Sequence, residues 1–277
     1  MAMMNSENMA QDLSPITFCD VVGSTNDEVR KLGQEGAEAG TALAAHAQTE
    51  GRGRRGHLWH SPAGGLYLSV LLRPQVSMQM LMGLPAACAL GAVDALRSLG
   101  VGEAGIKWPN DIVIADQKLA GILVEAGYGE KGVFAVCGIG VNIAPQQEVR
   151  RAVLEEFDGF QRPLTPAFLS DHVEQVPDFE QLATTIRDAI VRRAKQWEQS
   201  MAGRTVAGPL ATILDEYFDA MPAVGQVMDA VLPDGRSMAT GVFAGMDVWG
   251  RAILVTQDGE EVTISAEQAS LRRTASA

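Results

Sequence analysis

The sequence predicts an α+β protein in which a main domain, with a sheet flanked by helices, is followed by a small all-β domain. Apolar residues make up 47% of the 277 residues and charged residues 20%, which is enough for a substantial core. Strand-like and helix-like runs are mixed as far as about residue 221. Beyond that point only short strand-like runs remain, separated by turn signals such as Pro233-Asp234-Gly235 and Asp258-Gly259. We therefore expect a flexible tail at 1–15, a main domain at 16–221 and a small β domain at 222–277.

The first elements follow from short apolar runs and one capping signal. Ile16–Val22 and Thr41–Gln48 are typical of strands, and the continuous apolar run Leu66–Leu72 predicts a buried strand. Between the first two, Ser24 offers an N-cap and is followed by early acidic residues, which predicts a helix to about Gln34.

The later elements of the main domain are a pair of long helices around three strands. Met78–Leu99 is Ala-rich and predicts a helix, with Pro85 as a kink or an early break. From Phe179 to Met201 apolar residues recur every three or four positions, which predicts one face of a long helix. The other predicted elements are strands at 111–114, 120–126 and 133–143 and a second helix over 209–218.

The charge balance argues against a general binder of nucleic acid or of an anionic membrane. The chain has 22 Lys and Arg against 34 Asp and Glu, a formal net charge of −12, and both of those partners are polyanions. The stretch between His46 and Arg73 reverses this sign locally, since it holds four arginines and one glutamate.

The sequence also points to a reducing compartment, and we expect a cytoplasmic protein. Cys19, Cys88 and Cys137 are widely separated, with no paired spacing for zinc or for a disulfide framework. The first residues lack a secretory signal pattern, and the longest apolar stretch, Met80–Val93, is too short to span a bilayer.

The most informative motif is Gly51-Arg52-Gly53-Arg54-Arg55-Gly56. Its glycines allow backbone N–H groups to approach a ligand closely, and its guanidiniums are fixed charges suited to phosphate or carboxylate. On composition alone, a solvated, flexible surface loop is as good an interpretation as a functional one, and an RNA contact is a second alternative. With little to bury, such a loop is expected to be mobile until it binds an anion.

Two further segments carry polar groups next to strands. Lys107-Trp108-Pro109-Asn110-Asp111 is followed by Lys118-Leu119-Ala120-Gly121, in which Lys118 begins an apolar strand. Gly138-Ile139-Gly140-Val141-Asn142 is a strand whose glycines allow close packing or a ligand against the backbone. Singly, each also fits a turn, a snorkelling lysine or a core strand.

In this order, however, the segments resemble the biotin–protein ligase family. The set comprises Gly23-Ser24-Thr25-Asn26, Gln48, the Gly51–Gly56 motif with Trp59, the Lys107–Asp111 motif, the Lys118 motif and the Gly138–Asn142 motif. It covers residues ~16–143, and Ser265–Arg272 looks like the family's closing strand. The resemblance implies a class II synthetase-like mixed sheet flanked by helices and an SH3-like C-terminal β-barrel. It also implies a reaction in which biotin and ATP, with Mg²⁺, give biotinyl-5′-AMP, whose biotinyl group passes to a lysine of a biotin carboxyl carrier protein.

The resemblance carries roles onto matching positions of this chain. It implies that Lys118, Arg54 and Asp111 are catalytic, with no metal-ligating residues. Biotin-binding positions would be Ser24, Thr25, Asn26, Gln48, Arg52, Gly53, Arg54, Lys118 and Gly121. Positions for ATP or the adenylate would be Arg52, Arg54, Arg55, Trp59, Lys107, Asn110, Gly138, Gly140 and Asn142, with Gly138 and Gly140 leaving room for the ligand.

Several points stay open at this level. His57 replaces a further Arg of the bacterial pattern, and the 145–178 segment, with Arg150-Arg151, has no assigned role. Because only 23 residues precede Ser24, we expect the single-function form without a DNA-binding domain. The carrier domain of a carboxylase is the expected partner, a homodimer is left open, and nucleic acid and membrane are not expected partners. The alternatives are a ligase of the same fold for another acyl group, such as lipoate or octanoate, and a non-catalytic nucleic-acid-binding module.

Overall fold

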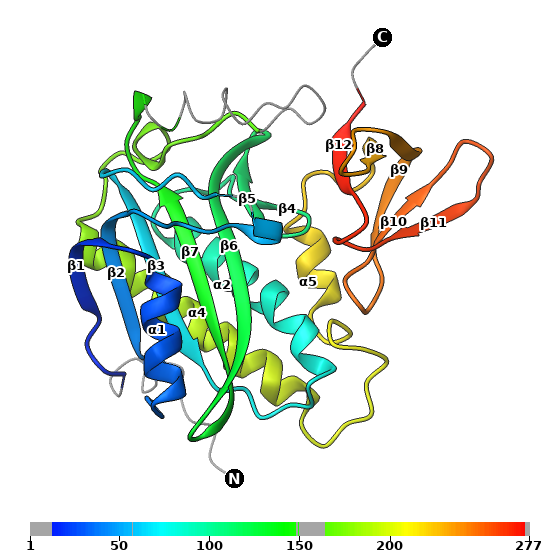
Figure 1. Ribbon diagram of the computed structural model, residues 1–277. Coiled ribbons are helices and arrows are strands. Elements are labelled where there is room, and N and C mark those ends of the chain that lie inside the picture. The colour runs from blue at the N-terminus through cyan, green and yellow to red at the C-terminus, as the bar shows by residue number, and fades with distance from the viewer. Residues whose placement is uncertain (1–12, 57, 148, 150–163, 275–277) are drawn as a thin grey trace.

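The computed structural model describes residues 13–56, 58–147, 149 and 164–274 (Figure 1). Most of the predicted tail at 1–15, together with His57, Arg150 and Arg151, lies outside these residues. Within them the chain forms two sheets and four α-helices that carry labels in Figure 1.

The main sheet has seven strands in the order β1-β2-β3-β7-β6-β5-β4. β1 and β2 are parallel, while all other neighbours are antiparallel, which makes the sheet mixed, as predicted. The strands are β1 (Thr17–Val22), β2 (Ala42–Gln48), β3 (Gly65–Leu72), β4 (Gly105–Lys107), β5 (Asp111–Ile114), β6 (Gln117–Gly129) and β7 (Gly132–Asn142). The short strand β4 was not predicted.

Helices cover both faces of this sheet (Figure 1). α1 (Thr25–Gln34) lies on one face, where Val29 packs with Leu71 and Phe134. α2 (Leu84–Ser98) and α4 (Phe179–Met201) lie on the other. This double cover explains why β3 is buried along its whole length: alternate side chains enter the two layers.

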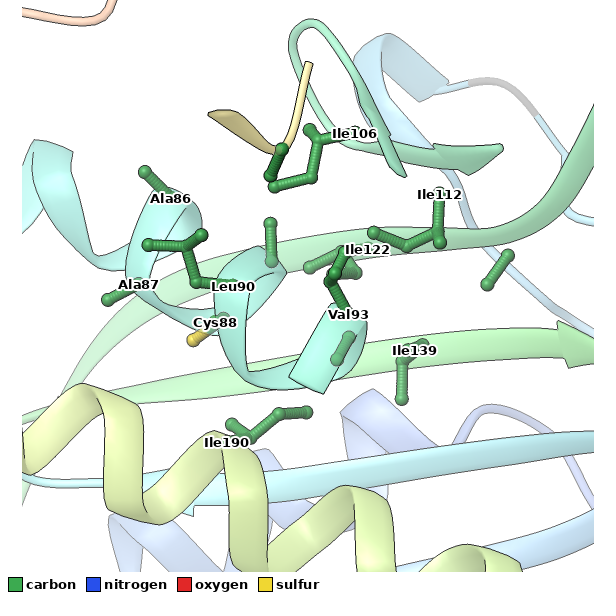
Figure 2. Packing of buried hydrophobic residues seen from close by; sticks show 14 of the residues in the cluster. Ala86, Ala87, Cys88, Leu90, Val93, Ile106, Ile112, Ile122, Ile139 and Ile190 are labelled. Carbon is green, nitrogen blue, oxygen red and sulfur yellow. The ribbon is translucent and has the colours of Figure 1, made fainter. Parts of the chain in front are cut away.

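The core between α2, α4 and the sheet is built largely from small and branched side chains (Figure 2). Gly91 allows a close approach of the two helices, because a Cβ there would lie 2.8 Å from the carbonyl oxygen of Ala189. The segment Met80–Ser98 has the length and apolarity of a membrane-crossing helix, but 67% of it is buried inside the protein. It packs as a core helix of this domain.

Two helices are shorter than predicted. α2 begins at Leu84, with Pro85 in its first turn where a missing N–H costs nothing, and a 3₁₀ turn at Met80–Gly83 precedes it. The predicted helix over 209–218 is confirmed only as α5 (Leu214–Asp219), because residues 209–213 form turns. Another 3₁₀ turn lies at Leu169–Asp171.

The C-terminal part forms a five-stranded antiparallel sheet in the order β11-β10-β9-β8-β12. Its strands are β8 (Val227–Val231), β9 (Ser237–Met246), β10 (Ala252–Val255), β11 (Glu261–Ile264) and β12 (Ser270–Arg273). The expected closing strand at 265–272 is therefore a turn followed by β12.

The small sheet packs beside β4, β5 and α5 (Figure 1). Trp108 Nε1 donates to the carbonyl of Gly250, in the turn between β9 and β10, at 2.9 Å. The N–H of Ile106 in β4 donates to the carbonyl of Ala220, directly after α5, at 2.6 Å. Buried side chains of the small sheet, among them Phe243, belong to the same core cluster as α2. This contact brings the turn before β12 next to the Lys107–Asp111 motif.

Candidate active site

Every residue predicted to bind or react lines one cavity of about 720 Å³. The cavity lies over β6 and β7, between the N-terminus of α1, the Gly51–Gly56 loop and the turn before β12. Six Lys and Arg residues line it against a single carboxylate, that of Asp111, among the residues the structure describes. This excess of cationic side chains favours an anionic ligand in the cavity.

The end of the cavity near α1 is neutral and densely hydrogen-bonded, and we call it the neutral end. Gln48 Oε1 accepts from the Thr25 backbone N–H at 2.8 Å and lies 3.0 Å from Thr25 Oγ1. Asn26 Nδ2 donates to Glu125 at 2.9 Å, and Asn26 Oδ1 lies 2.6 Å from the buried hydroxyl of Ser69. These amide and hydroxyl groups are suited to an uncharged, polar ligand.

The opposite end, which we call the charged end, is built around Asp111. Lys118 Nζ lies 2.8 Å from Asp111 Oδ1, across the β5–β6 pair. Burial would raise the pKa of Asp111, but the charges of Lys118 and Lys107 outweigh it and hold the pKa below its ordinary value. The carboxylate therefore stays ionised and holds Lys118 in place.

Two other cations at this end have lowered pKa values. Burial lowers the pKa of Lys107 to about 8; Asp111 opposes this shift, while Arg272 and Lys118 add to it. Burial also lowers the pKa of Arg272, again opposed by Asp111. Asp111 thus acts on all three cations, and the cationic groups of this end are suited to the phosphate or carboxylate groups of a ligand.

The Gly51–Gly56 loop is held by acidic groups from distant parts of the chain. Arg52 is ion-paired with Asp27 and lies 3.4 Å from Glu125. Arg54 lies 3.1 Å from Glu267 in the C-terminal part and 3.4 Å from Asn110. Arg55, with a left-handed φ of 56°, donates to the carbonyl of Ala266. In place of the solvated arginines expected of a mobile loop, the structure has guanidiniums with protein partners.

Side chains of other residues lie against the glycines of β6 and β7, in the space that we expected a ligand to use. Gly121 and Gly140 are direct cross-strand partners, and the indole of Trp59 lies on both of them. A Cβ at Gly140 would lie 2.2 Å from Trp59 Nε1, and one at Gly138 would lie 2.1 Å from Asn26 Oδ1. Lys118 Nζ lies 4.9 Å from the centre of a Trp59 ring.

Trp59 Nε1 is also a buried donor without a partner in the described part of the chain. A ligand over β7 would have to share this surface with the indole or displace it. The remaining predicted residues, Ser24, Gly53 and Asn142, line the cavity as well, and Asn142 Nδ2 donates to the carbonyl of Lys118 at 3.1 Å.

Sequence reasoning missed four residues that shape the site. Ser69 is a lone polar residue inside the apolar run Leu66–Leu72, and that isolation was its signal. Glu125 lies within the predicted strand at 120–126 and was given no role. Packing of the C-terminal sheet brings Arg272 to the cavity wall and Glu267 to Arg54, and the sequence carries no local signal for this packing.

Comparisons with known proteins identify the family. Residues 18–142 match the model of the biotin/lipoate A/B protein ligase family. The biotin–[acetyl-CoA-carboxylase] ligase of Paracoccus denitrificans is 31% identical over 250 residues, covering 88% of this chain and 95% of that protein. The corresponding ligase of Mycobacterium tuberculosis is 30% identical over 250 residues, covering 88% of this chain and 84% of its own length.

Other similarities are partial or concern the fold. The bifunctional ligase/repressor BirA of Bacillus spizizenii is 36% identical over 147 residues, so the match covers 52% of this chain and only 44% of that relative. A biotin protein ligase from Aquifex aeolicus, solved in complex with biotin and ATP, superposes with a TM-score of 0.74 at 24% identity, covering 95% of this chain and all of that one. With two relatives of 30% identity or more matched over most of their length, the chain belongs to the biotin protein ligases of the biotin/lipoate A/B protein ligase family.

Proposed function

We propose that the protein activates biotin with ATP to biotinyl-5′-AMP and transfers the biotinyl group to a lysine of a biotin carboxyl carrier domain. The observation that carries this proposal is the division of one cavity into a neutral, hydrogen-bonding end and a cationic end. Biotin has the same division, with a ureido ring at one end and a carboxylate at the other, and ATP brings a further anion.

The charged end is suited to joining two anions. The biotin carboxylate must attack the α-phosphorus of ATP, so positive charge has to be placed before the reactants meet. Lys118, held by Asp111 at 2.8 Å, would lie between carboxylate and phosphate, and Lys107 and Arg272 would neutralise the phosphates. Pyrophosphate leaves as the carboxylate–phosphate bond forms.

Magnesium would enter as part of the nucleotide substrate. No group of three metal-ligating side chains occurs in the described ranges, and Asp111 is already paired with Lys118. Phosphate oxygens and water are the usual ligands of Mg²⁺ in such sites, with few protein carboxylates.

The arginine loop would keep the activated intermediate from water. Arg52, Arg54 and Arg55 line the cavity and have protein oxygens as partners, and an adenylate would offer them stronger anionic ones. A loop closed over the mixed anhydride slows its hydrolysis until the carrier lysine attacks and AMP leaves.

Two alternatives are less well supported. A lipoate or octanoate ligase would need an apolar pocket for the acyl chain, whereas Thr25, Asn26 and Gln48 line a polar one. A nucleic-acid-binding module would present its arginines on an open basic surface, whereas Arg52 and Arg54 are paired with carboxylates.

The proposed partner is the carrier domain of a carboxylase, by analogy with the ligases of Paracoccus denitrificans and Mycobacterium tuberculosis. A cytoplasmic location also stays a proposal, in keeping with three free cysteines. The oligomeric state is left open, and light scattering would determine whether the protein is a homodimer.

One assay tests the proposed function directly. A biotin carboxyl carrier domain is incubated with the protein, biotin and Mg²⁺-ATP, and its mass is then measured by mass spectrometry. We expect the mass of one biotinyl group on one lysine, and none when biotin is replaced by lipoate. An unmodified carrier, or equal labelling with lipoate, would refute the proposal.

A further inference from the structure

The hydrogen-bond chain at the neutral end has one hydrogen fewer than its contacts require. Three short oxygen–oxygen contacts follow one another: Asn26 Oδ1 to Ser69 Oγ at 2.6 Å, Ser69 Oγ to Thr25 Oγ1 at 2.8 Å, and Thr25 Oγ1 to Gln48 Oε1 at 3.0 Å. A hydroxyl carries a single hydrogen, so Ser69 and Thr25 supply two hydrogens for three contacts. In every arrangement, one pair of oxygens faces each other without a hydrogen.

The Gln48 end of this chain cannot supply the missing hydrogen. Gln48 Oε1 accepts from the backbone N–H of Thr25 at 2.8 Å, a group that can only donate. On the other side, Gln48 Nε2 donates to Ser61 Oγ at 2.9 Å, and the Ser61 hydroxyl is committed to the carbonyl of Trp59 at 2.8 Å. The amide of Gln48 is therefore fixed with its oxygen toward Thr25.

Glu125 fixes the Asn26 end in the same way. Asn26 Nδ2 donates to Glu125 Oε2 at 2.9 Å, and a carboxylate only accepts. The amide oxygen is thereby turned toward Ser69, above the bare backbone of Gly138. Arg30 holds the other carboxylate oxygen of Glu125 at 3.0 Å, which keeps the acid in place.

We infer that Glu125 and Ser69 are positioning residues that make the neutral end require an N–H donor from the acyl substrate. This inference rests on the proposed function and deepens it. Ser69 is fully buried and, like Glu125, is not part of the cavity wall; both act through Asn26 and Thr25. A ureido ring carries two N–H groups and can donate the missing hydrogen, whereas a lipoyl or octanoyl chain has none. When such a chain binds, the pair of oxygens that faces each other without a hydrogen stays uncompensated, which disfavours it.

The decisive variant is Glu125→Gln, which keeps the shape but reverses the polarity of one atom. The new carboxamide can donate to Asn26 Oδ1, so that the Asn26 amide turns and donates to Ser69. Ser69 then donates to Thr25 and Thr25 to Gln48, and the chain is complete without a ligand. We expect the KM for biotin in pyrophosphate exchange to rise roughly tenfold, with the melting temperature unchanged. The KM for ATP should rise much less, because Arg52 loses only one of its two carboxylate partners. The preference for biotin over octanoate should fall by a similar factor.

Three matched variants separate polarity from charge and from packing. Glu125→Asp keeps an acceptor-only carboxylate and should lie closer to wild type than Glu125→Gln does. Arg30→Gln removes the outer partner of Glu125 and should leave the KM for biotin within about twofold, because one surface ion pair contributes little. In a Ser69→Ala background the turned Asn26 amide finds no acceptor, so adding Glu125→Gln should cost less than it does in wild type.

The outcomes are distinguishable. An unchanged KM for biotin in folded Glu125→Gln, or an equal rise in the KM for ATP, would overturn the inference. If that variant does not fold, Ser69→Ala decides: Thr25 then has one hydrogen for its single contact, Asn26 Oδ1 is an open acceptor, and the KM for biotin should not rise. A rise of about tenfold or more would overturn the inference. Wild-type protein without biotin-dependent exchange would instead refute the proposed function itself.

Discussion

Lys107 should make the binding of ATP sensitive to pH near 8, well below the 10.5 at which lysine ordinarily titrates. Burial lowers the pKa of this ammonium to about 8, and the neighbouring charges of Arg272 and Lys118 add to the shift, while Asp111 opposes it. A polyanionic nucleotide binds the charged form of Lys107 better than the neutral form. Raising the pH through 8 should therefore weaken nucleotide binding before other lysines lose their charge.

The size of the effect follows from the pKa. If binding requires charged Lys107, the dissociation constant doubles at pH 8 and rises about tenfold by pH 9. The assay is equilibrium binding of α,β-methylene-ATP, with biotin at saturation, between pH 7 and 9.5. Lys107→Met should bind weakly with a flat profile, and Lys107→Arg should also be flat because a guanidinium stays charged. A flat wild-type profile, or a Lys107→Met variant with the wild-type slope, would refute the reasoning.

The lowered pKa of Lys107 also makes the free energy of unfolding depend on pH. The pKa of Lys107 is lower in the folded state, so between pH 8 and 10.5 the unfolded chain binds more protons and the free energy of unfolding rises with pH. Below pH 8 the folded protein carries the cost of a buried charge, about 3 kcal/mol at most and less where solvent reaches the group. Lys107→Met should therefore melt at a higher temperature than wild type at pH 7, as calorimetry can measure.

Three further predictions concern the loop and its neighbours. Lys118→Ala should lower biotin-dependent pyrophosphate exchange by at least about 100-fold while the protein stays folded, and wild-type exchange would refute its role. Arg54→Gly loses the contacts with Asn110 and Glu267 and should release the adenylate, so that mass spectrometry finds biotin on lysines of unrelated proteins; labelling confined to the carrier lysine would contradict the shielding role. Gly140→Ala places a Cβ 2.2 Å from Trp59 Nε1 and should push the indole off β7. Trypsin should then cleave faster within residues 50–60 than in wild type. Biotin with ATP should slow this cleavage in the wild-type protein. Equal cleavage rates in all three samples would refute the coupling of Trp59 to the loop.

The sequence predicted those elements whose burial pattern repeats over enough residues. The apolar run of β3 and the three-to-four spacing of α4 are both found where expected. The strand β4 escaped because three residues that begin with a glycine carry no periodicity. The prediction of a helix over 209–218 was wrong for its first half, because residues 209–213 form turns. The N–H groups of Ala211 and Ile213 donate within these turns, and the N–H of Leu210 donates to the carbonyl of Val248 in the β9–β10 turn.

Residues of the candidate site were likewise predicted where they belong to a local sequence pattern and missed where they do not. Residues that lie in short, recognisable motifs, such as Lys118 and Asp111, were predicted and meet in one cavity, although their roles remain predictions. Arg272, which lines the cavity, and Glu267, which pairs with Arg54, were missed because their positions depend on how two sheets pack, which no local pattern encodes. The bare strand at Gly140 was read as space for a ligand, because the sequence could not indicate that Trp59 lies on it.

The ion pair between Arg54 and Glu267 joins positions that are 213 residues apart. A growing polypeptide folds from its N-terminal side as it is made, so the sheet that carries Lys118 can form while Glu267 has not yet been translated. During that interval Arg54 lacks its partner in the C-terminal part. A nascent or truncated chain should therefore hold substrates less securely than the finished one.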